Sequence, residues 1–202
     1  IRFGRSRSGR NIEREQRVLA AYHEAGHALV QMMLDDADPV EKITIIPRGR
    51  AMGATLALPE KDRYSYGKKY LDATLRTLCA GRVAETKKTG DISSGAQDDI
   101  KKATELVKKM VLEWGMSERL GFVQYCDDDQ ETGWVMNKSQ SEETGRQIDE
   151  EIRRIVGNAY EDAEHIIHTH WDSVVEIAEE LLKRETLVAE DLERILRAPQ
   201  QA

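Results

Sequence analysis

The chain has 202 residues, of which 33% are charged and 5% are aromatic, and its formal net charge is −7 at pH 7. This length can bury the core of a single domain, and the composition favours helices over an all-β fold. The negative charge argues against a general nucleic-acid binder, and no run is apolar enough to cross a bilayer. Two cysteines are too few for a disulfide framework, and this low number indicates a reducing compartment.

The first ten residues form a basic segment, and a long helix is predicted to follow it. Residues 1–10 carry four arginines and no acidic residue, which is typical of a linker or tail. Four clustered charges beside an acidic remainder are weak support for a nucleic-acid module. Asn11 can cap the helix, and the acidic residues after Leu34 end it.

This helix carries an H-E-x-x-H motif at His23, Glu24 and His27. Two histidines four residues apart lie on one face of a helix, where they can bind zinc, and the glutamate can reach a water on the metal. Such a motif also occurs by chance in a packed core. The helix is apolar on nearly all sides, so it is predicted to be buried, and buried histidines need partners. A mid-helix Gly26 indicates that another element packs closely there.

The rest of the chain predicts a small β-sheet or hairpin followed by helices. The expected fold class is mainly α: a zincin-like H-E-x-x-H helix, the small sheet, and a C-terminal helical hairpin packed on the first half. The predicted elements are strands at 42–47 and 52–58, helices at 65–86 and 95–115, a surface loop at 126–139, and helices from 141, around 174–182 and at 189–196.

The motif leaves the third metal ligand open. The extension H-E-x-x-H-x-x-G-x-x-H is excluded, because Val30 and Met33 stand where glycine and histidine are required. The remaining histidines, His165, His168 and His170, are expected to lie in an exposed polar turn rather than at a metal.

An aspartate on a later helix is the best candidate for this ligand. If a helix starts near Gly95, Asp98 lies on its solvated face, whereas Asp99 lies in line with apolar residues and points towards the core. A carboxylate directed at the core needs a strong partner, so Asp99 is assigned as the ligand. Glu85 is the alternative candidate for this ligand. We expect it instead to lie next to a ligand histidine and to accept a hydrogen bond from the free N–H of that ring.

The second predicted strand is a candidate for substrate binding. Gly53, Ala54 and Thr55 lie at its start, and an edge strand there could pair with an extended peptide. The alternative is a strand that only packs beneath the zinc helix.

Several stretches occur in a characteristic order along the chain, and together they resemble the peptidase domain of the FtsH-type ATP-dependent zinc proteases. The resemblance implies a zinc endopeptidase in which His23, His27 and Asp99 hold Zn²⁺ and Glu24 is the general base. Asp98 stands where the family has asparagine, and Ala80 also departs from the pattern. The matching stretches are 21–30, 44–53, 58–60, 81–85, 94–100, 103–104 and 113–117.

The resemblance also implies a wider organisation. Residues 1–10 would be a linker from an upstream AAA ATPase module with a membrane anchor. Residues 11–198 would be the peptidase domain, with a metal-site half at 11–125 and the helical hairpin at 140–198, before a tail at 199–202.

The expected partners and location follow from the same family. We expect a homohexamer that acts on unfolded or membrane protein substrates and binds no nucleic acid. The expected location is the reducing side of a membrane, either the cytoplasmic face of a bacterial inner membrane or its organellar equivalent. The alternative is a metal-free or degenerate structural module that forms rings. The presence of all four site residues speaks against it.

Overall fold

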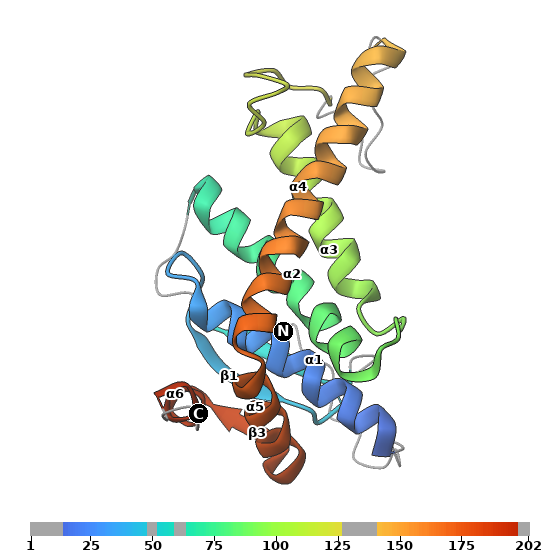
Figure 1. The fold of residues 1–202 in the computed structure, drawn as a ribbon. Helices are drawn as coiled ribbons and strands as arrows, with labels where there is room; N and C mark the ends of the chain where they lie inside the picture. The colour runs from blue at the N-terminus through green and yellow to red at the C-terminus, as the bar shows by residue number, and fades with distance from the viewer. Residues whose placement is uncertain (1–13, 48–51, 59–63, 127–140, 198–202) are drawn as a thin grey trace.

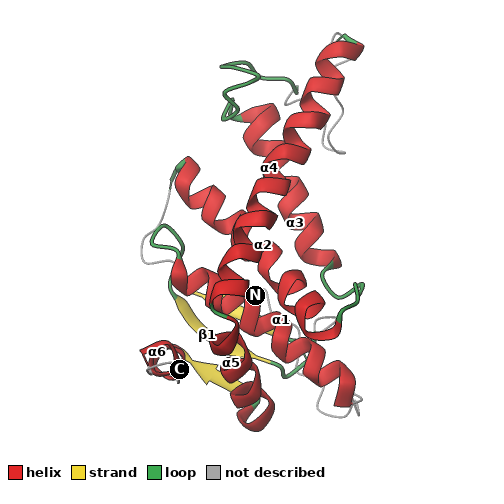
Figure 2. Ribbon diagram, in the orientation of Figure 1, coloured by secondary structure: helices red, strands yellow, loops and turns green. Residues whose placement is uncertain are grey.

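The computed structural model describes residues 14–47, 52–58, 64–126 and 141–197, and in them helices dominate (Figures 1 and 2). The mainly α fold class with a small sheet is confirmed. No helix of the described residues has the length and hydropathy that a membrane span needs. The helices are α1 (Arg14–Met33), α2 (Lys68–Thr89), α3 (Gln97–Lys108), a π-helix (Lys109–Glu113), α4 (Glu142–Thr169), α5 (Trp171–Arg184) and α6 (Ala189–Arg197), and the strands are β1 (Val40–Thr44), β2 (Ala54–Ala57) and β3 (Thr186–Val188).

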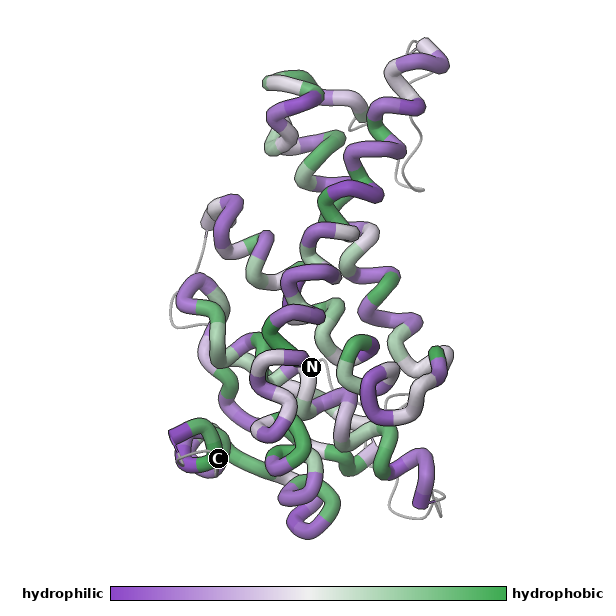
Figure 3. Tube along the Cα trace, in the orientation of Figure 1, coloured by the Kyte–Doolittle hydropathy of each residue, from purple (hydrophilic) through white to green (hydrophobic). Residues whose placement is uncertain are grey.

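Helix α1 is the centre of the core. It packs on α2, on α5 and on β1, so most of its surface from Ala21 onwards is buried, as its sequence predicts. Hydrophobic and hydrophilic residues alternate along the long outer helices, which bury one face each (Figure 3). Met33, the last residue of the helix, is 38% exposed.

Helices α1 and α2 approach each other very closely at Gly26. A Cβ atom at this position would lie 2.7 Å from the backbone oxygen of Ala80 and 2.7 Å from Cβ of Ala84. Side chains do not tolerate such distances, so only glycine permits this separation of the two helices. The sequence-based inference of a close neighbour at Gly26 is therefore confirmed.

The small sheet has three antiparallel strands in the order β2-β1-β3. Strand β3 was not predicted, because three residues between two helices show no alternating pattern. Helix α5 ends at Arg184, and its C-cap residue Glu185 has a φ of 62°, after which the chain turns into β3. The backbone oxygen of Glu185 accepts hydrogen bonds from Ile45 N and Thr44 Oγ1, both at 3.0 Å, so the end of α5 is attached to β1.

The two long C-terminal helices pack on the first half of the chain, as expected. Ser141 caps α4, where its side chain accepts a hydrogen bond from Thr144 N at 3.1 Å. In detail, α4 packs chiefly on α2 and α5 chiefly on α1, so the pair spreads over two helices rather than forming a close hairpin of its own (Figure 1).

Several predicted features differ or lie outside the described part of the chain. The helix expected at 95–115 divides into α3 and a π-helical turn that ends at Trp114, whose N–H donates to the Lys109 oxygen. The segment 1–10, the Asn11 cap, nearly all of the loop at 126–139 and the tail at 199–202 are outside the described residues.

The close α1–α2 contact predicts a clear contrast between two helical glycines. In an open helix, glycine-to-alanine substitution stabilises by up to about 1 kcal/mol through helix propensity. Gly157→Ala in α4 should show this gain, since a Cβ there meets nothing within 4 Å. Gly26→Ala should instead lower the free energy of unfolding by about 1–3 kcal/mol through overpacking. Urea unfolding of both variants measures the difference, and equal stabilisation by both would contradict the close contact.

Candidate metal centre

Three side chains from two helices converge on one point. His23 and His27 extend from α1, and Asp99 extends from the first turn of α3. The two Nε2 atoms are 2.9 Å apart, and Asp99 Oδ2 lies 3.1 Å from His23 Nε2 and 3.4 Å from His27 Nε2. Asp98 is exposed, so the two neighbouring aspartates point in different directions.

The second ring nitrogen of each histidine has its own acceptor on or near α2. His27 Nδ1 lies 2.6 Å from the backbone oxygen of Thr77, and His23 Nδ1 lies 2.6 Å from Oε1 of Glu85. A carbonyl or carboxylate oxygen can only accept, so both Nδ1 atoms carry a hydrogen, and in the neutral rings both Nε2 atoms present a lone pair. Glu85 also accepts from Ser93 Oγ at 2.6 Å.

The geometry and chemistry of this group fit zinc. Ligand atoms about 2.1 Å from a tetrahedral zinc stand about 3.4 Å from one another, close to the three separations found here. Two imidazole lone pairs and a carboxylate oxygen are all electron donors, and they repel one another unless a cation lies between them. A zinc ion held by these three side chains would keep its fourth position for water, as in catalytic rather than structural zinc sites.

The ionisation of these groups shows the same preference for positive charge. Burial lowers the pKa of His23, but the hydrogen bonds to Asp99 and Glu85 and the charge of Glu24 raise it to about 10. Burial raises the pKa of Asp99, but the two histidines hold it well below its usual range. The centre therefore favours a cation, whether a proton or a metal ion.

Gly81 of α2 makes room for the histidine rings. A Cβ atom there would lie 2.6 Å from Cε1 of His23 and 2.6 Å from Nε2 of His27. The rings thus lie directly over the backbone of α2, and any side chain at this position would displace them. Together with Gly26, this glycine makes the contact between the two helices closely complementary.

Glu24 lies beside the cluster and faces the sheet. The residue is 6% exposed, and its Oε2 accepts a hydrogen bond from Thr55 Oγ1 of β2 at 2.7 Å. A Cβ atom at Gly53 would stand 2.6 Å from Glu24 Oε1. Because Gly53 has no side chain, it leaves room for the carboxylate of Glu24.

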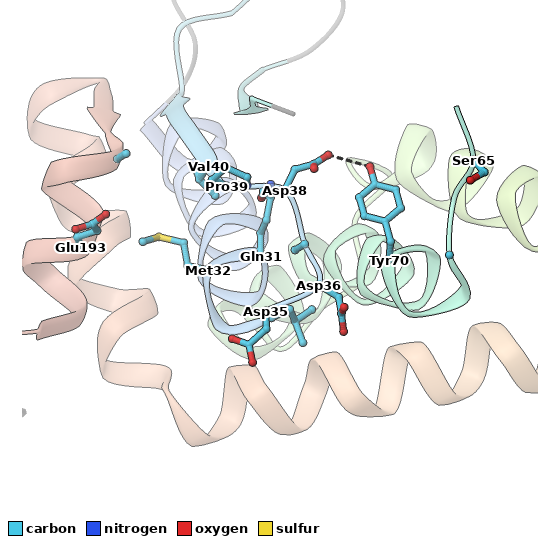
Figure 4. Close-up of a pocket in the computed structure, with 14 residues that line it drawn as sticks. Gln31, Met32, Asp35, Asp36, Asp38, Pro39, Val40, Ser65, Tyr70 and Glu193 are labelled. Carbon is cyan, nitrogen blue, oxygen red and sulfur yellow. Dashed lines mark hydrogen bonds between the residues drawn. The ribbon is translucent and has the colours of Figure 1, made fainter. Parts of the chain in front are cut away.

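The other candidates from the sequence lie elsewhere. His165 and His168 are exposed, as expected, but they lie within α4 rather than in a turn, and His170 is half-buried between α4 and α5. A groove of about 620 Å³ at the end of α1 also contains none of the converging residues (Figure 4). Asp38 lies in it and accepts a hydrogen bond from Tyr70 Oη at 2.9 Å.

Three supporting contacts were not predicted from the sequence, among them that of Thr55, a candidate for substrate binding, with Glu24. Thr77 acts through its backbone oxygen, which residue type does not reveal. Ser93 and Thr55 lie in other elements, so no helical spacing relates them to the motif. Gly81 did carry a signal, because a glycine in the middle of a helix costs about 1 kcal/mol and indicates a close neighbour.

Comparisons with known proteins agree with this geometry. The model of peptidase family M41 matches residues 10–195. The chain is 44% identical to ATP-dependent zinc metalloprotease FtsH 2 of Methylacidiphilum infernorum, over 98% of this chain and 31% of that protein. It is 42% identical to ATP-dependent zinc metalloprotease FtsH of Magnetococcus marinus, over 97% of this chain and 30% of that protein. The chain thus spans about a third of these relatives, and it belongs to peptidase family M41.

Proposed function

We propose that this chain is a zinc-dependent endopeptidase domain that hydrolyses peptide bonds. The observation that carries the proposal is the convergence of two histidine nitrogens and one carboxylate oxygen on a single point. The tautomer of each histidine is fixed by an acceptor next to its other ring nitrogen. Such fixation is typical of metal-binding histidines. The names of the relatives, zinc metalloproteases, support the same function.

His23, His27 and Asp99 would hold the zinc ion, with Glu85 orienting the ring of His23 from behind. Bound zinc supplies a Lewis acid that polarises the scissile carbonyl and lowers the pKa of a water molecule to about 7. Glu24 is the general base. Its Oε2 is occupied by the Thr55 hydroxyl, so Oε1 accepts the proton of the attacking water and passes it to the leaving amine nitrogen.

Among the described residues, β2 pairs only with β1, and the substrate would lie along its other, free edge. The Leu58 N–H donates to the Pro39 oxygen on the β1 side. Backbone groups alternate along a strand, so Leu56 and Ala54 also face β1, whereas the N–H and C=O groups of Thr55 and Ala57 face away from it. An extended peptide pairing with this edge would pass beside Glu24, and such pairing reads little sequence.

The rest of the proposal concerns a longer protein. The relatives are named ATP-dependent and are about three times as long as this chain. We propose an upstream AAA ATPase module that delivers unfolded or membrane protein substrates, a homohexameric assembly, and a position on the reducing side of a membrane. The family resemblance supports these points, and nucleic acid has no part in them.

The assignment of the third ligand predicts a contrast between two adjacent aspartates. Asp99→Ala should lose the zinc, because two histidines alone hold it poorly, while the exposed Asp98→Ala should keep about one zinc per chain. Metal analysis by mass spectrometry after dialysis measures both. Full zinc retention in the Asp99 variant would refute the assignment.

The role of Glu24 predicts that binding and catalysis can be separated. In Glu24→Gln the amide keeps the shape of the side chain but cannot accept a proton from water. The variant should therefore retain zinc and lose cleavage of an unfolded protein such as casein by about 10²- to 10⁴-fold. Cleavage at the parent rate would mean that Glu24 is not the base, whereas loss of zinc would place it among the ligands.

The edge-strand proposal predicts a specific effect of proline at Ala57. Ala57→Pro removes an N–H from the free edge only, and proline is tolerated there, so the fold and the zinc content should be unchanged. Loss of one hydrogen bond to the peptide should raise KM about three- to tenfold. Unchanged steady-state cleavage of a fluorogenic peptide by the folded variant would show that the peptide lies elsewhere.

A further inference from the structure

Thr55 joins the predicted substrate strand to the predicted catalytic base. It lies in β2, and its hydroxyl donates to Glu24 Oε2 on α1 at 2.7 Å, with a longer contact of 3.5 Å to the Glu24 backbone oxygen. Thr55 is partly buried and Glu24 is nearly fully buried, so water competes little with this hydrogen bond.

The contact leaves the carboxylate of Glu24 little freedom. Among the described residues, Thr55 provides the side-chain hydrogen bond that this carboxylate accepts. The other oxygen, Oε1, passes so close to Gly53 that a Cβ atom there would collide with it. One oxygen is held and the other is directed past the backbone of β2, so the rotamer of Glu24 depends on the position of this strand.

The same residue faces the predicted peptide with its backbone. The N–H and C=O groups of Thr55 point to the free edge of β2, while its side chain points out of the plane of the sheet towards α1. A peptide that pairs with this edge would restrain Thr55 directly. Its hydroxyl would then restrain Glu24, without any contact between Glu24 and the substrate side chains.

We propose that Thr55 is a positioning residue that orients Glu24 and couples substrate pairing on β2 to the alignment of the base. The inference rests on the proposed function, since it takes Glu24 as the base and β2 as the substrate strand. It assigns to the threonine hydroxyl a role in the rate of the chemical step, distinct from the binding role of its backbone.

The test uses Thr55→Val and Thr55→Ser, made in the protein as it occurs in the cell. Valine keeps the shape and the strand preference of threonine but lacks the hydroxyl, whereas serine keeps the hydroxyl. Steady-state cleavage of a fluorogenic peptide gives kcat and KM, and metal analysis gives the zinc content. Thr55→Val should keep its zinc and lower kcat about ten- to a hundredfold, with KM changed less than about threefold. Thr55→Ser should recover most of the parent kcat.

Two further variants complete the design. Thr74→Val removes a hydroxyl that bonds only within α2, to the Tyr70 oxygen, and should leave kcat unchanged. Glu24→Gln tests the proposed function separately. If Glu24→Gln is inactive and Thr55→Val has the parent kcat, the role of Thr55 is refuted while the function stands. If Glu24→Gln is fully active, the proposed base itself is wrong.

The remaining outcomes also decide the question. If Thr55→Val does not fold cooperatively, Thr55→Ala is compared with Thr55→Ser in the same assays. Loss of zinc from both the valine and the alanine variants would overturn the inference, because the hydroxyl would then support the metal centre as a whole. A rise in KM with unchanged kcat would also overturn it, because Thr55 would then act through binding alone.

Discussion

The close contact between α1 and α2 is the constraint on which the rest of the site depends. Each helix contributes a glycine to it: Gly26 lies against the backbone of α2, and Gly81 lies beneath the two histidine rings of α1. At this separation, an acceptor on α2 reaches the outer nitrogen of each ring. Rings fixed in this way present their remaining lone pairs to the same point, which is what a metal ion requires. A helix pair at ordinary spacing would leave the rings free to rotate.

The other elements complete the site from two directions. Glu85 accepts from both His23 and Ser93, so it connects the histidine ring to the loop that precedes α3, and this helix carries Asp99. From the opposite side, β2 brings Thr55 to Glu24. The two histidine rings therefore have their partners on helix α2, whereas the carboxylate of Glu24 has its partner in the sheet. A shift of the sheet would thus act on the Glu24 carboxylate before it reached the histidine rings.

Much of this organisation could be predicted from the sequence, because periodicity carries the information. The apolar surroundings of the motif predicted a buried α1, and the helix faces separated Asp99, which meets the histidines, from Asp98, which is exposed. The features that escaped prediction lack a local signal. Strand β3 is three residues long and gains its identity from pairing with β1. The Thr77 oxygen is a backbone atom, and the hydrogen bond from Thr55 to Glu24 joins a strand to a helix across 31 residues.

The pairing of β3 with β1 has a consequence for the order in which the protein matures. Thr44 and Glu185 are 141 residues apart in the chain, yet their hydrogen bond helps to hold the central strand in place. Contacts of such long sequence separation form late in folding, because a large loop must close first. During synthesis the histidine motif emerges from the ribosome early, but β1 gains its second neighbour only when nearly all of this chain has been made. The sheet that carries Thr55, the partner of Glu24, thus gains its third strand only after His23, His27 and Asp99 have all been made.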